Sequence, residues 1–177
     1  LIKGGAYLEI PAKLRAIAMD KTGTLSAGRP EVQLVVSIDE HTEYELLERA
    51  AALEAFSEHP LAEAIRRRAK RDGVVPLKAE GFRALAGLGA EAQIDGRDYW
   101  VGSHRLMEEK GKETPGYCNL ARGFEALGQT VVAVGSDRHV CGLISVSDSV
   151  RPEANDAVKG LKRAGISHVV MLTGDHE

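Results

Sequence analysis

Residues 20–24 read Asp20-Lys21-Thr22-Gly23-Thr24 and directly follow an apolar stretch. This order places a carboxylate at the end of a predicted buried strand, and ligands of open α/β sheets lie outside the carboxyl ends of the strands. An Asp in this position can attack a phosphoryl group and form an aspartyl-phosphate. Lys21 can offset charge on that group, and Gly23 lets the backbone approach it closely. The hydroxyls of Thr22 and Thr24 can donate to its oxygens. An Asx-type turn would account for each residue singly, but poorly for all five in this order.

A second group of residues is suited to binding a nucleotide. It comprises Glu54, the string Ser57-Glu58-His59-Pro60-Leu61, Gly87, Gly89 and the pair Gly102-Ser103. A His can stack on an adenine ring, a Glu can accept from its exocyclic amine, and glycines let a nucleotide approach the backbone. Each piece alone is weak, since a His before Pro more often begins a helix. Polar groups that converge on an apolar cleft are what a small-molecule site needs.

Composition limits the classes of protein to consider. The 177 residues include 23 Lys+Arg and 26 Asp+Glu, which gives a net charge of −3, and 44% are hydrophobic. This permits one ordinary domain or two small ones with a real core. Without a basic stripe, nucleic acid is not an expected partner. No run reaches the roughly 18 apolar residues of a membrane span, and the first residues lack a signal-peptide pattern. The chain does not begin with Met, so we expect an excised fragment.

The potential metal ligands show no motif. Cys118 and Cys141 are far apart, which argues against a disulfide framework or a thiolate metal site and favours buried thiols. The six histidines lack the paired spacing of metal ligands, so scattered surface histidines are expected. They are His41, His59, His104, His139, His168 and His176.

The hydrophobic pattern predicts strand–motif segments at both ends and a mixed α+β insert between them. Buried strands are predicted over 14–19 and 166–172, with a turn and linker at 26–30. These two strands should be parallel neighbours joined through a right-handed crossover helix, 152–164, which would bring Thr173 near Asp20.

Local signals define the elements of the insert. Thr42 is a predicted N-cap and Pro60 a predicted first helical residue. Asp95-Gly96 indicates a two-residue hairpin. The predicted helices are 43–56, 60–71, 103–111 and 116–127, and the predicted strands are 32–38, 90–94, 97–101, 130–134 and 139–146.

The string Asp20–Thr24 closely resembles the phosphorylation motif of P-type ATPases. Ser57–Leu61 looks like the nucleotide-binding signature of the heavy-metal-transporting members, and Thr173-Gly174-Asp175 is similar to a phosphate-side loop of the same family. Residues 148–152 resemble its hinge, so the resemblance covers essentially the whole chain. Residues 1–9 look like the stretch after a transmembrane helix in zinc, cadmium or cobalt exporters, and less like that of copper exporters.

The resemblance implies an α/β fold. A partial Rossmann-like, haloacid dehalogenase-like phosphorylation domain would carry an inserted α+β nucleotide-binding domain built on an antiparallel sheet. The implied domains are residues 1–29 and the truncated 148–177 for phosphorylation, and 30–147 for nucleotide binding.

The resemblance also implies a mechanism. Glu54 and His59 would hold the adenine of ATP, while Gly87 and Gly89 would admit the phosphates. The γ-phosphoryl group would pass to Asp20, with Lys21 and Thr173 stabilising its oxygens and Mg²⁺ held by Asp20 and Thr22. Further residues implied at the phosphorylation site are Thr22, Thr24, Gly174 and Asp175. Gly102 would also contact nucleotide, but Ser103 stands where the family often has Asn and lacks its amide.

The implied protein is a metal-cation exporter whose remaining transmembrane and actuator domains are partners of this segment, on the cytoplasmic face of a membrane. The segment itself would not enter the membrane. The family's Gly-Asp-Gly-x-Asn-Asp motif, with its Mg²⁺ carboxylate, is absent, so this chain should bind ATP with little or no turnover. Two alternatives remain open. One is a soluble haloacid dehalogenase-type phosphatase, although Thr22 stands where such enzymes usually carry a second acid. The other is a nucleotide-sensing module in which Asp20 is never phosphorylated.

Overall fold

The computed structural model describes residues 14–112 and 114–172. The chain divides into two compact units, one formed by Leu1–Arg29 with Asp148–Glu177 and the other by Pro30–Ser147. Within the described ranges, none of the helices has the length and apolar character that a membrane span requires.

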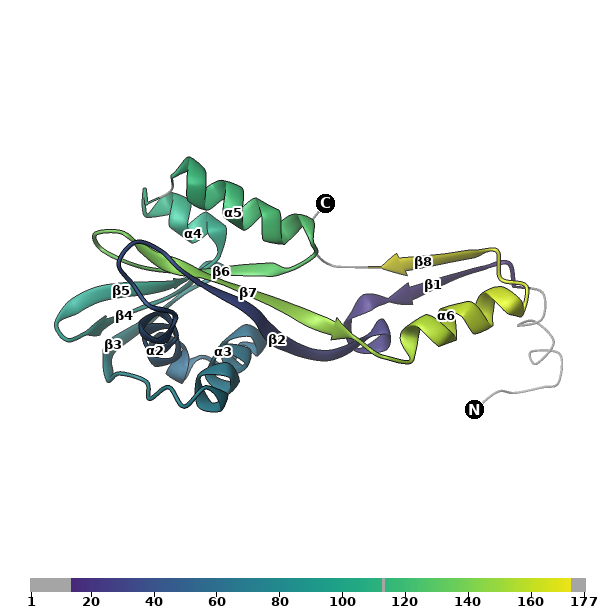
Figure 1. Ribbon diagram of the computed structural model, residues 1–177, viewed down its shortest axis with the longest axis horizontal. Coiled ribbons are helices and arrows are strands. Elements are labelled where there is room, and N and C mark those ends of the chain that lie inside the picture. Colours follow the sequence, from purple (N-terminus) through teal and green to yellow (C-terminus); the bar gives the residue numbers. More distant parts are fainter. Residues whose placement is uncertain (1–13, 113, 173–177) are drawn as a thin grey trace. The chain divides into compact units, whose positions relative to one another are not determined.

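The larger unit is built on a six-stranded sheet of order β2-β7-β6-β5-β4-β3 (Figure 1). Its strands are β2 (Ser26–Ser37), β3 (Ala79–Leu85), β4 (Gly89–Ile94), β5 (Arg97–Gly102), β6 (Thr130–Ser136) and β7 (Val140–Val150). The pairings from β3 to β7 are antiparallel, so the predicted antiparallel insert is confirmed. Asp95 and Gly96 take φ angles of 50° and 72°, as a tight two-residue hairpin turn requires.

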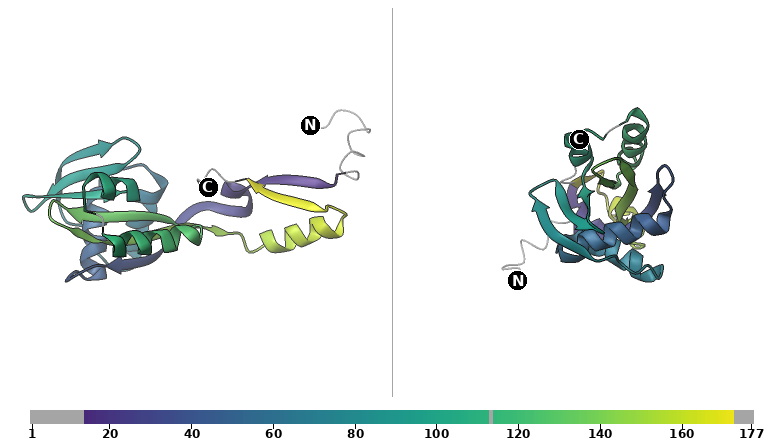
Figure 2. Two further views of the ribbon diagram at one scale, coloured as in Figure 1. Left: turned by 90° about the horizontal axis from the view of Figure 1, so that it is seen from above. Right: turned by 90° about the vertical axis from the view of Figure 1, so that its left-hand side faces the viewer.

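Helices cover both faces of this sheet (Figures 1 and 2). The helices α2 (Glu43–Leu53) and α3 (Pro60–Arg71) lie on one face, and α4 (His104–Glu109) and α5 (Pro115–Ala126) lie on the other. In β6, Val132 and Val134 pack with the α2–α3 core, while the alternate residues Val131 and Ala133 pack with the α4–α5 core. This period of two is why residues 131–134 of β6 are all apolar.

The ends of α2 and α3 follow from local chemistry. Thr42 caps α2 through a capping box with Glu45, as its sequence position predicts. The predicted helix 43–56 ends in a 3₁₀ turn, Glu54–Phe56, instead of continuing as α-helix. Pro60 then begins α3 at the first-turn position.

The smaller unit contains β1 (Ala16–Asp20), β8 (His168–Leu172) and α6 (Ala154–Arg163), which lies beside the two strands (Figure 1). The two strands are parallel neighbours, as predicted, and Asp20 stands opposite Leu172.

Two sequence predictions for this unit are wrong. The strands were expected to be buried, yet every residue of β1 and β8 is exposed or half-buried, with Met171 and Leu172 each 54% exposed. Among the described residues this sheet has two strands and one flanking helix, which is too little surface to bury both faces. Residues 26–30 were expected to form a turn, but they begin β2. There the carboxylate of Asp148 accepts from the backbone N–H groups of Gly28 and Arg29, at 3.1 Å each.

Candidate functional site

The predicted nucleophile Asp20 is the last residue of β1, and it is exposed. Lys21–Leu25 follow as a single π-helical turn that contains Lys21, Thr22 and the exposed Thr24. Gly23 has φ 78°, a conformation that glycine adopts without strain, and its N–H donates to Ser26 Oγ at 3.3 Å. Isolated π turns of this kind are frequent at functional sites.

Two residues of the predicted hinge, Asp148 and Arg151, hold this turn in place. Arg151 donates from its backbone N–H to the carbonyl of Leu25 (2.9 Å), and from its guanidinium to the carbonyls of Ser26 (3.0 Å) and Gly23 (3.3 Å). Asp148 accepts a short hydrogen bond from Ser26 Oγ. These contacts join residues more than 100 positions apart, so no local spacing could have indicated them.

The second predicted loop, Thr173-Gly174-Asp175, lies outside the described residues, as does the expected approach of Thr173 to Asp20. The register of β1 and β8 is defined as far as the pair Asp20 and Leu172.

In the larger unit, one cavity of about 400 Å³ gathers the predicted nucleotide-binding residues. Its lining includes Glu54, His59, Gly87, Gly89 and Gly102. These residues come from the α2–α3 connection, the turn between β3 and β4, and strands β4 and β5, which are separate in sequence. The rest of the lining is mainly apolar and includes Leu61, Phe82, Ala90, Val131 and Val132. A few polar groups at the edge of an apolar cavity are typical of small-molecule sites.

Glu54 is the acidic group of this cavity and is only 9% exposed. Burial raises the pKa of its carboxyl above the ordinary value, although the Ser57 hydroxyl and Arg66 act in the opposite direction. Arg66 also donates to the backbone carbonyls of Glu54 and Ser57, the latter at 2.6 Å. Arg66 therefore fixes the turn that carries both Glu54 and the Ser57–Leu61 string.

His59 is the N-cap of α3, and its side chain is exposed. Its Nδ1 accepts from the backbone N–H of Leu61 at 3.2 Å. In the neutral ring the proton then lies on Nε2, which leaves a donor and the ring faces for a ligand. The helix-start role expected of a His before Pro and a place in the cavity are thus compatible.

The glycines of the cavity differ in whether close packing between strands requires them. Gly89 and Gly102 are cross-strand partners, and a Cβ on Gly89 would lie 2.0 Å from the carbonyl oxygen of Val101. A Cβ on Gly102 would lie 2.2 Å from the carbonyl oxygen of Leu88. Gly87 has φ 71° and nothing within 4 Å of its added Cβ. Strand packing therefore requires Gly89 and Gly102 with or without a ligand, whereas Gly87 borders open space.

Ser103 also lines the cavity. Its backbone N–H donates to the carbonyl of Leu88 at 2.8 Å, but its Oγ is buried with no hydrogen-bond partner among the described residues. A buried hydroxyl without a partner is unfavourable by about 1–3 kcal/mol. A polar ligand group is one way to satisfy it.

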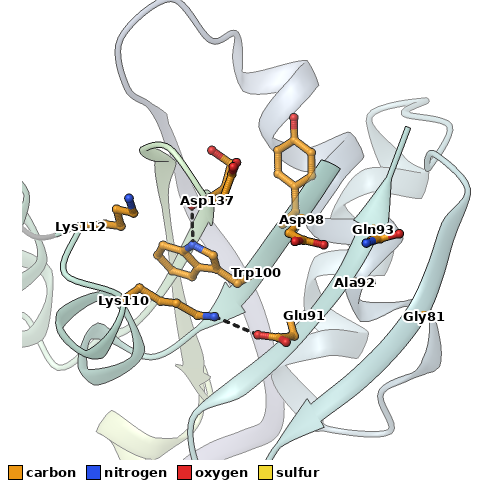
Figure 3. A pocket seen from close by; sticks show the side chains of 11 residues that line it. Gly81, Glu91, Ala92, Gln93, Asp98, Trp100, Lys110, Lys112 and Asp137 are labelled. Atoms are coloured by element: carbon orange, nitrogen blue, oxygen red, sulfur yellow. Dashed lines mark hydrogen bonds and ion pairs between the residues drawn. The ribbon is translucent and has the colours of Figure 1, made fainter. Parts of the chain in front are cut away.

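A larger cavity of about 670 Å³ contains none of the predicted site residues (Figure 3). Two of its charged groups are paired, because Lys110 Nζ lies 2.9 Å from Glu91 Oε2, and Arg83 also bonds Glu91. Asp98, Lys112 and Asp137 line this cavity too. These partners hold the pKa of Glu91 below its ordinary value. Trp100 Nε1 donates to the carbonyl of Ser136 at 3.0 Å. We place the candidate site in the smaller cavity, because that cavity gathers the predicted nucleotide-binding residues.

Comparison with known proteins agrees with this geometry. Residues 14–177 match the haloacid dehalogenase-like hydrolase family. A probable cadmium-transporting ATPase of Staphylococcus aureus (strain MRSA252) is 38% identical over 182 aligned residues, which cover all of this chain and 25% of that protein. The crystal structure of a zinc-transporting PIB-type ATPase superposes with a TM-score of 0.81 at 39% identity, covering 99% of this chain and 28% of that one.

A smaller structure matches the larger unit. The crystal structure of the N-domain of HMA8, a copper-transporting P-type ATPase, has a TM-score of 0.56 at 31% identity, and covers 66% of this chain and 99% of that chain. The chain spans about a quarter of the length of the curated relatives that it matches.

Proposed function

Because the chain belongs to the haloacid dehalogenase-like hydrolase family, and within it to the heavy-metal P-type ATPases, we propose that it is the ATP-binding and phosphorylation segment of a metal-cation exporter. The observation that carries the proposal is the convergence of Glu54, His59, Gly87, Gly89 and Gly102 on one cavity. We assign ions of the zinc and cadmium group as cargo, as transported by some of the relatives, although copper-transporting relatives are equally similar. We assign the segment to the cytoplasmic face of a membrane, with transmembrane and actuator domains as its partners.

In this proposal the cavity binds the adenosine part of ATP. The exposed ring of His59 stacks on adenine or donates to it from Nε2, because Nδ1 is occupied by the N–H of Leu61. The Glu54 carboxylate accepts from the exocyclic amine, and the apolar walls cover the rest of the base. The phosphates extend past Gly87, where nothing lies within 4 Å of an added Cβ. The unpartnered Ser103 hydroxyl hydrogen-bonds a polar atom of the ligand.

The reaction proposed for Asp20 is a phosphoryl transfer. A carboxylate oxygen of Asp20 attacks the γ-phosphorus in line, the bond to the β–γ bridging oxygen breaks, and ADP leaves. Catalysis in such a step depends on position and charge, since the reacting atoms must come within about 3–3.5 Å. Arg151 and Asp148 hold the turn that follows Asp20, so they set the position of the nucleophile. We assign the cation Lys21 and the loop Thr173–Asp175 to the oxygens of the transferred group.

Mg²⁺ is the ion that this reaction requires. It prefers carboxylate, hydroxyl and phosphate oxygens, and the exposed carboxylate of Asp20 offers a ligand of that kind. We assign Asp20 and Thr22 as its protein ligands. When bound, Mg²⁺ neutralises charge on the phosphoryl group. One described carboxylate is a weak site, in line with our expectation of little turnover by this chain alone.

Calorimetric titration of ATP into the protein tests the cavity. His59→Ala should weaken binding about tenfold or more, which corresponds to about 1.4 kcal/mol. Glu58→Ala is the matched control, because Glu58 is its exposed neighbour and lies outside the cavity lining. Equal affinities for the wild type and His59→Ala would overturn the assigned pocket.

A second experiment tests Asp20. Phosphorylation from labelled ATP and Mg²⁺ should be slow or undetectable in this chain, and any acyl phosphate formed should be absent from Asp20→Asn. Rapid labelling would contradict the expected low turnover, and labelling that survives Asp20→Asn would refute the assignment of the nucleophile.

A further inference from the structure

Three side chains that can bind a metal meet outside the lining of the nucleotide cavity. His41 lies between β2 and α2, His139 lies at the turn between β6 and β7, and Cys141 belongs to β7. The Nε2 atoms of His41 and His139 are 2.6 Å apart, and the two rings meet edge to edge in nearly one plane, with centroids 4.9 Å apart. Cys141 Sγ lies 4.0 Å from His139 Nε2. One ligand atom from each residue lies within 4.8 Å of the other two. Sequence spacing predicted scattered histidines, and for His41 and His139 that prediction is wrong because the fold joins positions 98 residues apart.

The fold holds these side chains on fixed elements. Between β6 and β7, Val134 pairs with Gly142 and Gly135 pairs with Val140, so Cys141 is the extra residue of a β-bulge. Bulges re-aim side chains next to functional sites. The carbonyl of Cys141 accepts from the N–H of Ile38 at 2.9 Å. The thiol is fully buried, whereas both histidines are half-buried.

We propose that His41 Nε2, His139 Nε2 and Cys141 Sγ form a binding site for a thiophilic d¹⁰ cation of the zinc or cadmium type, with water as the fourth ligand. Imidazole nitrogen and thiolate sulfur are the preferred donors for such ions. With Zn–N of about 2.0–2.1 Å and Zn–S of about 2.3 Å, tetrahedral nitrogens would lie roughly 3.3 Å apart and sulfur roughly 3.6 Å from nitrogen. To form the site, the two Nε2 atoms must separate by about 0.7 Å and the rings must turn so that both face the ion, while Cys141 Sγ approaches His139 Nε2 by about 0.4 Å. This site is separate from the phosphorylation chemistry and from any transported ion.

The surroundings of His41 supply a positioning carboxylate. Arg49 Nη1 donates to His41 Nδ1 at 3.0 Å, so the neutral ring carries its proton on Nε2 and donates it to His139. An ion on Nε2 requires the proton on Nδ1 instead. Glu45 Oε2 already lies 3.9 Å from Nδ1 and can accept that proton in a hydrogen bond. Arg49 retains other partners, because it lies 3.8 Å from Glu45 Oε1 and 5.5 Å from the centroid of the Tyr99 ring.

Protons and charges balance in this step. The ion forms bonds to two neutral imidazoles and one thiolate, and the Cys141 thiol releases one proton to solvent. The proton of His41 passes from Nε2 to Nδ1 by exchange with solvent. Arg49 repels the incoming cation, whereas the carboxylate of Glu45, whose Oε2 lies 3.9 Å from His41 Nδ1, attracts it.

The test uses Cd²⁺ alone as the probe, because a cadmium–thiolate bond produces an ultraviolet charge-transfer band. Titration of the wild-type chain with Cd²⁺ should produce this band, and the band should saturate at one equivalent of Cd²⁺. Added Zn²⁺ should displace the Cd²⁺ and remove the band. Cys141→Ser should abolish the band, and His139→Gln should weaken binding more than 100-fold. Glu45→Gln should weaken it about 10–100-fold, as expected for a positioning carboxylate. Cys118→Ser and His104→Gln are matched controls outside the cluster and should bind as the wild type does.

A band that is absent from the wild type, survives in Cys141→Ser, or disappears equally in Cys118→Ser would overturn the proposal. Because substitution of buried Cys141 could unfold the chain, X-ray absorption of the zinc-loaded wild type provides a test without variants. One sulfur at about 2.3 Å with nitrogen or oxygen neighbours at about 2.0–2.1 Å is expected. A shell without sulfur would refute the site.

Discussion

Replacement of Gly89 by Ala tests whether the packing of β4 against β5 requires a glycine here, apart from the position of Gly89 in the lining of the nucleotide cavity. The new Cβ would lie 2.0 Å from the carbonyl oxygen of Val101 and 2.5 Å from the Cα of Gly102. Ordinary contacts between such atoms are about 3.5–4.0 Å, so β4 and β5 must move apart by more than about 1 Å. Overpacking typically costs about 1–3 kcal/mol, and each hydrogen bond lost from the ladder adds about 1 kcal/mol. We expect Gly89→Ala to lower the free energy of unfolding by about 3–5 kcal/mol.

Gly87→Ala is the matched control, since Gly87 lines the same cavity. Nothing lies within 4 Å of its added Cβ, so the penalty comes only from its φ of 71°. A non-glycine residue in that conformation costs about 1–2 kcal/mol, and reduced freedom of the unfolded chain returns about 0.4–1 kcal/mol. The net loss should be about 1 kcal/mol.

Urea unfolding of the wild type and both variants measures the difference. With an m-value of about 1–3 kcal/mol/M, the midpoint of Gly89→Ala should fall by at least about 1 M, and that of Gly87→Ala by less. Equal midpoints for the two variants would refute the inference that strand packing requires Gly89. A loss below about 1 kcal/mol in Gly89→Ala would show that β4 and β5 separate easily.

Three further predictions concern residues of the nucleotide cavity and of the segment that follows Asp20. Arg66→Ala removes the donor to the carbonyls of Glu54 and Ser57, so it should lower the free energy of unfolding by about 1.5–3 kcal/mol and weaken ATP binding. Urea unfolding and calorimetry measure the two effects. The control Arg105→Ala breaks an exposed pair with Glu109 and should change the free energy of unfolding by less than about 1 kcal/mol. Burial raises the pKa of the Glu54 carboxyl in the folded state, so the folded protein binds the carboxyl proton more tightly than the unfolded chain does. The wild type therefore loses stability as pH rises from the ordinary Glu pKa of about 4.3 through the raised value. Glu54→Gln should therefore gain stability relative to the wild type as pH rises through that window, and a difference independent of pH would contradict the assignment. Asp148→Asn weakens the hydrogen bonds that the backbone N–H groups of Gly28 and Arg29 donate to this side chain. Their amide protons should therefore exchange with solvent about tenfold faster or more, as measured by NMR, while the exchange rates of the β6 amides stay unchanged.

The sequence by itself determined the local structure of the insert and the family. Thr42, Pro60 and the pair Asp95-Gly96 act through hydrogen bonds and φ angles within a few residues, so their effects are encoded where they stand. The resemblance to heavy-metal P-type ATPases, first carried by the Asp20–Thr24 and Ser57–Leu61 strings, is confirmed by the comparisons.

Only the tertiary structure decided which distant residues meet. An apolar strand such as β1 predicts burial, but burial needs surface from other elements, and the described part of the smaller unit supplies too little. The support of Arg66 for the cavity and of Arg151 for the Asp20 turn depends on backbone carbonyls, which have no sequence pattern. A β-bulge at Cys141 brings a thiol to two histidines from other segments. Spacing along the chain records periodicity within an element, whereas these contacts depend on how the elements pack.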